Sequence, residues 1–401
     1  MKTYGTYFQN DSERPICYGE VNLINPPRRR LKGEEAKEGI EAYPVFCGFC
    51  GTDHELMRMG RDGKLKMKFP EGENRLINGH EGVVWVPSEN RFAIVLIRGG
   101  DSFDPTRYTE DETYFEYGCD GADGIFCDMG YFNPDMLLKL PEKYNGIKKL
   151  PLSAAKRLSF ADPYACAVFQ LERMEDLGSA QNFRVEMARH SCDEEEGRRR
   201  AKDSIFDRTV IFGLGMTGLF MADQIHRAHP SAKILLIGRG PETSRKVVFS
   251  KEITDADYLC TDGMSESETA TAITEKLGGR ATMFIGCSGS QVEHRVAFEH
   301  KALGCNGIYN SFSLGPAVGF DTMPFGFENH LIFASINFRR EHMEKAIEIL
   351  ADSRYDEVVE LIDKDEFIRD PYDAYENKIY CKGAPLKTAV IWNKEYIEES
   401  L

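Results

Sequence analysis

The chain has 401 residues, 42% of them apolar, and its 65 acidic side chains outnumber the 50 basic ones, giving a formal net charge of −15. This length predicts two domains, and the charge disfavours nucleic acids and anionic membranes, because phosphate binding requires clustered Lys and Arg. No stretch approaches the roughly eighteen apolar residues of a transmembrane helix, and the first residues lack the apolar core of a secretory signal. We therefore expect a soluble cytoplasmic protein.

The first 150 residues consist of short β-forming runs separated by clusters of Gly, Pro, Asn and Asp. Such spacing is typical of a compact all-β module. Strands are predicted at residues 42–46, 82–86, 92–97 and 137–140. A helix is predicted over 168–177, with Pro163 in its first turn. Residues 186–207 are highly charged and predict a solvated helix face or an exposed insertion.

After residue 208, predicted strands and helices alternate. The strands are 209–212, 233–237, 281–285 and 307–311, and the helices are 218–228, 270–277 and 292–302. This alternation predicts a doubly wound parallel sheet that binds its ligand at the carboxyl ends of the strands. A helix at 341–350 and a strand at 387–392 follow.

Two short motifs provide metal-ligating side chains. Cys50 opens the segment C-G-T-D-H-E, and His80 and Glu81 follow Gly79. Thiolate, imidazole and carboxylate are suitable ligands for tetrahedral Zn²⁺. The alternative interpretation is a buried free cysteine and a hydrogen-bonded structural histidine. Glu81 is either a direct ligand, a residue that supports the site from outside, or part of a structural salt bridge.

The cysteines number eleven and are scattered, which predicts reduced thiols and not a disulfide framework. Cys47 and Cys50 form C-x-x-C, but no thioredoxin-like pattern surrounds them. We interpret Cys50 as a ligand and Cys47 as a packed neighbour. Asp162, directly before Pro163, is a third candidate ligand, with an N-cap aspartate as the alternative.

A G-x-G-x-x-G motif follows the apolar run at 209–212. Gly213 permits a tight turn, Gly215 lets the backbone approach a pyrophosphate, and Gly218 allows close packing of helix and strand. Met216 and Thr217 complete this turn, at a helix N-terminus that favours phosphate.

The end of the next predicted strand distinguishes the two nicotinamide cofactors. No acid stands there to bind a ribose 2′-hydroxyl; Arg239, Ser244 and Arg245 occupy the segment instead. Arginines can hold a 2′-phosphate through charge-assisted hydrogen bonds. We therefore predict NADP as the preferred cofactor and NAD as the second candidate. The alternative is that these are ordinary surface charges.

Together these motifs resemble the zinc-dependent medium-chain dehydrogenase/reductase superfamily. With Glu116-Tyr117-Gly118 added, the sequence is most similar to the NAD(P)-dependent glucose dehydrogenase branch. The resemblance implies an α/β protein with a GroES-like β-rich catalytic domain over residues 1–180. It also implies a Rossmann nucleotide-binding domain over 181–337 and a return to the catalytic domain over 338–401.

The resemblance also implies residue roles. One catalytic zinc would be held by Cys50, His80 and Asp162, with Glu81 direct or supporting. Thr52 would relay the hydroxyl proton. Further residues expected at the substrate or cofactor are Glu55, Glu116, Ser288 and Asn337. No structural zinc is predicted, because only Cys119 and Cys127 lie where relatives carry a cysteine-rich lobe.

Two departures from the family pattern broaden the expected substrate. Asp162 replaces the commoner Glu, and bulky Phe338 follows Asn337. The pocket could therefore suit another sugar, an amino sugar or a cyclitol. We predict an NADP-preferring sugar or polyol dehydrogenase that is a homo-oligomer, by analogy a dimer or tetramer. The alternatives are an alcohol or amino-alcohol dehydrogenase, such as one for threonine, and a non-catalytic nucleotide-binding sensor.

Overall fold

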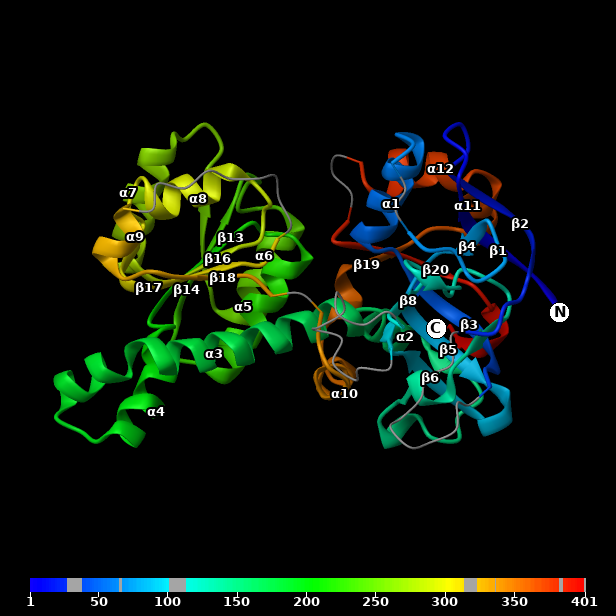
Figure 1. The fold of residues 1–401 in the computed structure, drawn as a ribbon, viewed down its shortest axis with the longest axis horizontal. Coiled ribbons are helices and arrows are strands. Elements are labelled where there is room, and N and C mark those ends of the chain that lie inside the picture. The colour runs from blue at the N-terminus through cyan, green and yellow to red at the C-terminus, as the bar shows by residue number, and fades with distance from the viewer. Residues whose placement is uncertain are drawn as a thin grey trace. The chain divides into compact units, whose positions relative to one another are not determined.

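The computed structural model describes residues 1–26, 38–64, 67–100, 113–313, 323–335, 337–381 and 385–399. The chain forms two compact units (Figure 1). One comprises Met1–Ala165 and Phe338–Leu401, and the other comprises Cys166–Asn337. The boundary expected at residue 180 falls inside helix α3 (Ala161–His190), which is much longer than the predicted helix at 168–177.

The first unit is built mainly of antiparallel β-sheet. In its largest sheet, the described strands have the order β11-β6-β5-β3-β20-β19, and β10 also pairs with β3. The bounds are β3 (Ile40–Gly48), β5 (Glu81–Val86), β6 (Arg91–Val95), β10 (Gly130–Phe132), β11 (Leu137–Lys139), β19 (Val359–Leu361) and β20 (Lys387–Ile391). All four predicted strands of the first 150 residues overlap members of this sheet.

The sequence analysis assigned no individual strand to the first forty residues, yet two form there. Strands β1 (Lys2–Gln9) and β2 (Ile16–Asn22) form a hairpin, and β1 also pairs with β4 (Arg75–Ile77). A smaller sheet joins β7 (Arg98–Gly99), β8 (Phe115–Tyr117) and β9 (Gly121–Ala122). The short strands β12 (Leu150–Pro151) and β21 (Ile397–Glu398) pair in parallel.

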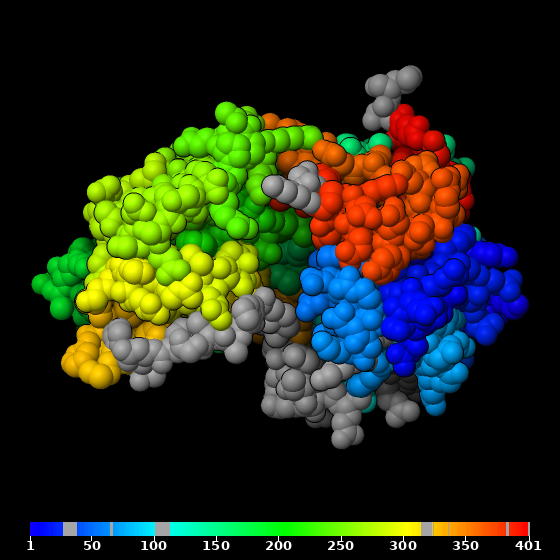
Figure 2. Space-filling model, turned by 90° about the horizontal axis from the view of Figure 1, so that it is seen from above, coloured from blue at the N-terminus to red at the C-terminus, as the bar shows by residue number. Residues whose placement is uncertain are grey.

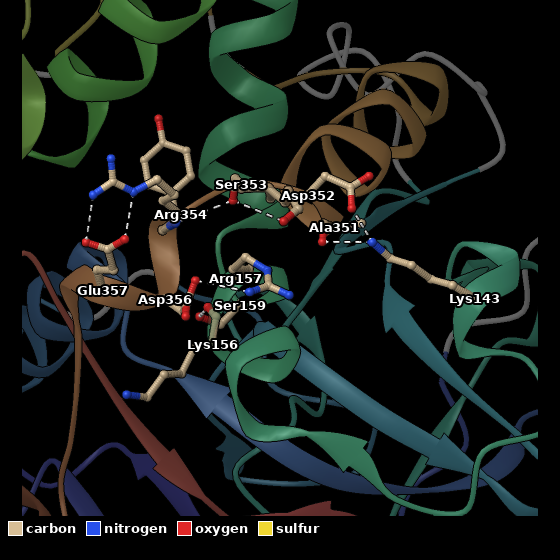
Figure 3. A network of polar contacts seen from close by, with 12 residues as sticks. Lys143, Lys156, Arg157, Ser159, Ala351, Asp352, Ser353, Arg354, Asp356 and Glu357 are labelled. Carbon is tan, nitrogen blue, oxygen red and sulfur yellow. Dashed lines mark hydrogen bonds and ion pairs between the residues drawn. The ribbon is translucent and has the colours of Figure 1, made fainter. Parts of the chain in front are cut away.

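The segment after residue 337 packs into the first unit. Helices α11 (Lys364–Arg369) and α12 (Pro371–Ala374) contact β2, and Figure 2 shows the orange and red C-terminal residues against the blue N-terminal strands. A polar network joins α2 (Leu152–Leu158) and Lys143 to the end of α10 (Arg340–Ala351) and to the turn that follows it, as Figure 3 shows. In it, Arg157 donates to Asp356 at 3.1 Å, and Lys143 donates to the Ala351 carbonyl at 3.0 Å.

The second unit contains a parallel sheet whose described strands have the order β15-β14-β13-β16-β17-β18. The strand order reverses direction between β13 and β16, which is where doubly wound sheets bind nucleotides. Its strands are β13 (Arg208–Phe212), β14 (Lys233–Gly238), β15 (Asp257–Cys260), β16 (Ala281–Gly286), β17 (Leu303–Ser311) and β18 (Leu331–Phe333). Apolar side chains from these strands and two covering helices, including Val210, Leu235, Ile273 and Phe284, form its core.

The helices of the second unit follow the predicted alternation, with local differences. They are α4 (Glu194–Ser204), α5 (Met216–Ala228), α6 (Arg245–Thr254), α7 (Glu266–Leu277), α8 (Gln291–Phe298) and α9 (Met323–Glu328). Helix α8 ends before the predicted residue 302, because Lys301 adopts a left-handed backbone with φ 56°. Helix α6 and strand β15 were not predicted. Among the described residues, no helix is both long enough and apolar enough to cross a membrane.

Candidate active site

Cys50 lies at a junction that its own side chain helps to form. Strand β3 ends at Gly48, and helix α1 (Gly51–Arg61) begins with Cys50 as its N-cap. The Cys50 sulfur accepts a hydrogen bond from the Thr52 amide at 3.5 Å. The buried Asp53 accepts from the Cys50 amide at 3.0 Å and from the Gly79 amide at 3.3 Å. Asp53 thus joins the two metal-ligating motifs, a role that the sequence analysis missed.

Cys50, His80 and Glu81 form a cluster that could hold a metal ion. One ligand atom of each lies within 4.8 Å of those of the other two, and no other such group occurs in the described part of the chain. His80 precedes β5 and Glu81 begins it, and both are buried. Sulfur, imidazole nitrogen and carboxylate oxygen are the donors that Zn²⁺ takes in proteins.

The chemistry of these donors fits a zinc ion. Glu81 Oε2 pairs with Lys387 from β20, and the two side chains are 0% and 1% exposed. Glu81 Oε1 is also buried and has no hydrogen-bond partner among the described residues. Burial raises the pKa of Cys50 to about 11, so its thiol is neutral without a metal. A dication would stabilise the Cys50 thiolate, and the unpartnered Glu81 oxygen could coordinate it.

Asp162 lies outside this cluster and pairs with a residue that the sequence analysis missed. Arg98 donates to Asp162 Oδ1 at 2.9 Å and to Glu116 Oε1 at 2.6 Å. Strand pairing of β7 with β8 places Arg98 opposite Glu116. Burial raises the pKa of Glu116, but Arg98 and a hydrogen bond from Tyr114 outweigh it, so the net pKa is below the usual value. The only sequence signal for Arg98 was a basic residue directly after an apolar run.

The other predicted substrate residues differ in their exposure to solvent. The Thr52 hydroxyl is exposed and lies 3.6 Å from the Cys50 sulfur. Glu55 is also exposed on α1, outside the metal-capable set. Asn337 is buried and takes a left-handed backbone with φ 66°.

The glycine-rich turn has the predicted form. Gly213 has a φ of 110°, and a Cβ there would lie 2.7 Å from the Ser288 amide nitrogen. A Cβ at Gly218 would lie 2.1 Å from the Gly213 carbonyl oxygen. Gly215 is the N-cap of α5 and has open space where its Cβ would be. The turn therefore brings Ser288 to Gly213 and leaves the N-terminus of α5 approachable.

A buried acid missed from the sequence supports the Ser288 side of this turn. Glu293 Oε2 accepts from the Ser288 amide at 3.0 Å and from its hydroxyl at 2.6 Å. This contact fixes the loop that follows β16, the strand beside β13. No local pattern in the sequence of α8 indicated that Glu293 would contact Ser288.

The predicted 2′-phosphate residues follow strand β14. Arg239 and Arg245 are exposed, and Ser244 is the N-cap of α6. Glu242 is the acid of this segment; it is exposed and lies 3.6 Å from Lys251. The carboxyl end of β14 therefore presents arginines and no buried acid.

The two units together have the fold of the medium-chain dehydrogenases, which confirms the predicted fold class. No family model matches the sequence. Solved structures at 14–17% identity show the shared fold alone.

The similar structures include the following three dehydrogenases. Glucose dehydrogenase from Haloferax mediterranei, in complex with NADP, Zn and gluconolactone, is 17% identical, with a TM-score of 0.66 over 98% of this chain and 99% of that chain. The 2R,3R-butanediol dehydrogenase from Bacillus subtilis is 16% identical, with a TM-score of 0.67 over 97% and 99%. L-idonate 5-dehydrogenase from Escherichia coli is 14% identical, with a TM-score of 0.65 over 98% of each chain.

Sequence comparison points to the same kind of protein. Glucose 1-dehydrogenase from Halobacterium salinarum is 33% identical over 126 residues, which are 27% of this chain and 34% of that protein. Glucose 1-dehydrogenase from Haloferax mediterranei is 29% identical over 175 residues, which are 40% of this chain and 42% of that protein. The matches thus span well under two thirds of these relatives. They confirm the predicted resemblance to glucose dehydrogenases.

Proposed function

We propose that the protein is a zinc-dependent dehydrogenase that transfers a hydride between a hydroxyl-bearing carbon of a sugar or polyol and NADP, with NAD as the second candidate cofactor. The observation that carries the proposal is the cluster of the half-buried Cys50 with the buried His80 and Glu81. It occurs in a chain whose other unit has a glycine-rich turn at the switch point of a parallel sheet. The glucose dehydrogenase relatives support the substrate class.

In this proposal Cys50, His80 and Glu81 hold the metal, and Asp162 joins them if Arg98 releases it. A bound zinc ion would act as a Lewis acid that lowers the pKa of the substrate hydroxyl. The Thr52 hydroxyl is the candidate to receive and relay the proton of that hydroxyl to solvent, which it reaches from its exposed position.

Glu116 would bind the sugar, because a carboxylate accepts hydrogen bonds from vicinal hydroxyls. Its lowered pKa keeps it ionised for that role. A half-buried, ionised carboxylate at the substrate disfavours small apolar alcohols, so the sugar or polyol assignment is preferred. Glu55 and Asn337 remain further candidates for substrate contact, and Asn337 also for the nicotinamide.

In the second unit, the phosphates would bind at the N-terminus of α5. The candidate contacts there are Gly213, Gly215, Met216, Thr217, Gly218 and Ser288. Arg239, Ser244 and Arg245 would bind the 2′-phosphate through charge-assisted hydrogen bonds. Both arginines are exposed to solvent, whereas Ser244 is half-buried.

We also propose a cytoplasmic, homo-oligomeric protein. All eleven cysteines are free, which supports a reducing compartment. Strand β18 is the edge strand of the described parallel sheet and carries the exposed Ile332. The preceding helix α9 carries the exposed Met323 and Phe327. Apolar groups at a sheet edge support pairing with a second copy.

The test is an absorbance assay for reduced nicotinamide with zinc-loaded protein, NADP or NAD, and a panel of aldoses, polyols, cyclitols and simple alcohols. We expect turnover with a sugar or polyol that is lost in Cys50→Ala and kept in Cys305→Ala, whose thiol is exposed and distant in sequence from the motifs. Turnover that survives in Cys50→Ala would refute the assigned metal centre. Turnover confined to simple alcohols would refute the substrate class.

A further inference from the structure

Besides Cys50 and Glu81, the ring of His80 has another close neighbour, which is buried. The Cys119 sulfur lies 3.0 Å from His80 Nδ1, and the two residues are 6% and 3% exposed. We propose that Cys119 is the positioning residue of the metal centre: its sulfur holds Nδ1 of His80, so that Nε2 is the nitrogen that binds the metal. This inference rests on the proposed zinc-dependent function.

The backbone around Cys119 is built to hold this contact. Gly118 has a φ of 72°, and a Cβ there would lie 2.3 Å from the Gly79 carbonyl oxygen. A Cβ at Gly124 would lie 2.1 Å from the same oxygen, which also accepts from the Ile125 amide at 2.9 Å. The loop that contains Cys119 therefore lies directly against the residue before His80, at two points where no side chain fits.

Cys119 acts on the histidine and not on the metal. Its sulfur is not part of the set of ligand atoms that lie within 4.8 Å of one another. The two imidazole nitrogens direct their lone pair and proton away from each other, so a group bound at Nδ1 cannot share an ion bound at Nε2. A metal-binding histidine usually donates its other N–H to a carboxylate, carbonyl or water. Here a cysteine sulfur, a weaker acceptor, takes that place.

The nearby carboxylate does not replace Cys119 in this role. Asp53 Oδ2 accepts from the Cys50 amide and Oδ1 from the Gly79 amide, and among the described residues neither oxygen forms a hydrogen bond with the His80 ring, whose Nδ1 contacts Cys119 instead. The same turn also begins with Glu116, whose carbonyl accepts from the Cys119 amide at 3.2 Å. A single turn thus carries the proposed sugar-binding acid and the partner of the metal-binding histidine.

The experiment compares Cys119→Ala, which removes the acceptor, with Cys119→Ser, which keeps one. Cys127→Ala is the matched control, because Cys127 is a buried thiol of the same unit that contacts the Gly124 carbonyl instead of His80. Zinc affinity is measured by competition with a chromophoric chelator, and the metal environment by the absorption spectrum of the cobalt-substituted protein. Thermal unfolding shows that each variant is folded.

We expect zinc affinity to fall about 10–100-fold in Cys119→Ala and to be largely restored in Cys119→Ser. The control should match the wild type, and the sulfur-to-cobalt absorption should keep its wild-type intensity because Cys50 remains the thiolate ligand. Equal affinity in Cys119→Ala and wild type, equal losses in both Cys119 variants, or a large loss of sulfur-to-cobalt intensity would each overturn the inference. A wild-type protein that binds no zinc would instead refute the proposed function.

Discussion

Lys387 offers a test of whether Glu81 faces a metal ion. Its ammonium pairs with Glu81, and both side chains are almost wholly buried. Burial lowers the pKa of Lys387 to about 8, so the ammonium is mostly protonated at pH 7. Lys387→Met removes the charge and keeps the apolar stem, which leaves the Glu81 carboxylate uncompensated. Breaking a buried ion pair in this way costs about 3–5 kcal/mol of the free energy of unfolding.

Zinc should offset much of this loss if it binds Glu81. The dication would then supply the positive charge that Lys387→Met removes. We expect the loss of unfolding free energy to be at least about 1.4 kcal/mol smaller with zinc than with a chelator. By linkage, this difference equals about tenfold tighter zinc binding in the variant.

Urea unfolding with chelator and with saturating zinc provides the assay, alongside a zinc titration of each protein. The double variant Glu81→Gln with Lys387→Met is the control. It removes both charges and should recover most of the stability lost without zinc. A loss in Lys387→Met that is the same in both conditions would refute the reasoning, because zinc would then not touch Glu81.

Three further perturbations test other parts of the structure. Arg239→Ala should raise the KM for NADP at least about tenfold and leave that for NAD nearly unchanged; parallel steady-state kinetics with the two cofactors measure this, and equal effects would exclude a 2′-phosphate contact. Arg98→Gln should raise the KM for the sugar about tenfold, because Glu116 loses its charged partner; an unchanged KM would show that this ion pair does not contribute to substrate binding. Burial raises the pKa of Asp123 to about 6 despite Arg75, above the roughly 3.9 of an unfolded Asp, so protonation stabilises the fold as the pH falls. As the pH falls from 6 to 5, the free energy of unfolding of the wild type should therefore rise by about 1 kcal/mol relative to that of Asp123→Asn, as measured by urea unfolding. A difference between the two proteins that does not change with pH would contradict this assignment.

Features encoded by neighbouring residues could be predicted from the sequence. The alternation of apolar runs and glycine-rich turns predicted the parallel sheet and the turn at Gly213. The two short motifs predicted that Cys50 and His80 belong to one site. Each of these signals depends on spacing within a few residues, which the backbone converts directly into local geometry.

Features that depend on distant parts of the chain could not be predicted in this way. Lys387 meets Glu81 only because β20 enters the sheet beside β3, which itself pairs with β5. Arg98 and Cys119 similarly gain their partners through strand pairing and a tight turn. Helix α6 was missed because its sequence, with adjacent Val247 and Val248, has no strong helical period and contains β-branched residues.

The most direct test of the central claim is to remove the metal with a chelator and restore zinc stepwise, following bound zinc and sugar-dependent formation of reduced NADP in the same samples. The proposed function predicts that activity disappears with the metal and returns in proportion to zinc, reaching its maximum at one ion per chain. Full turnover in the chelated protein, or zinc bound at the Cys50 cluster with no turnover of any sugar or polyol, would contradict it.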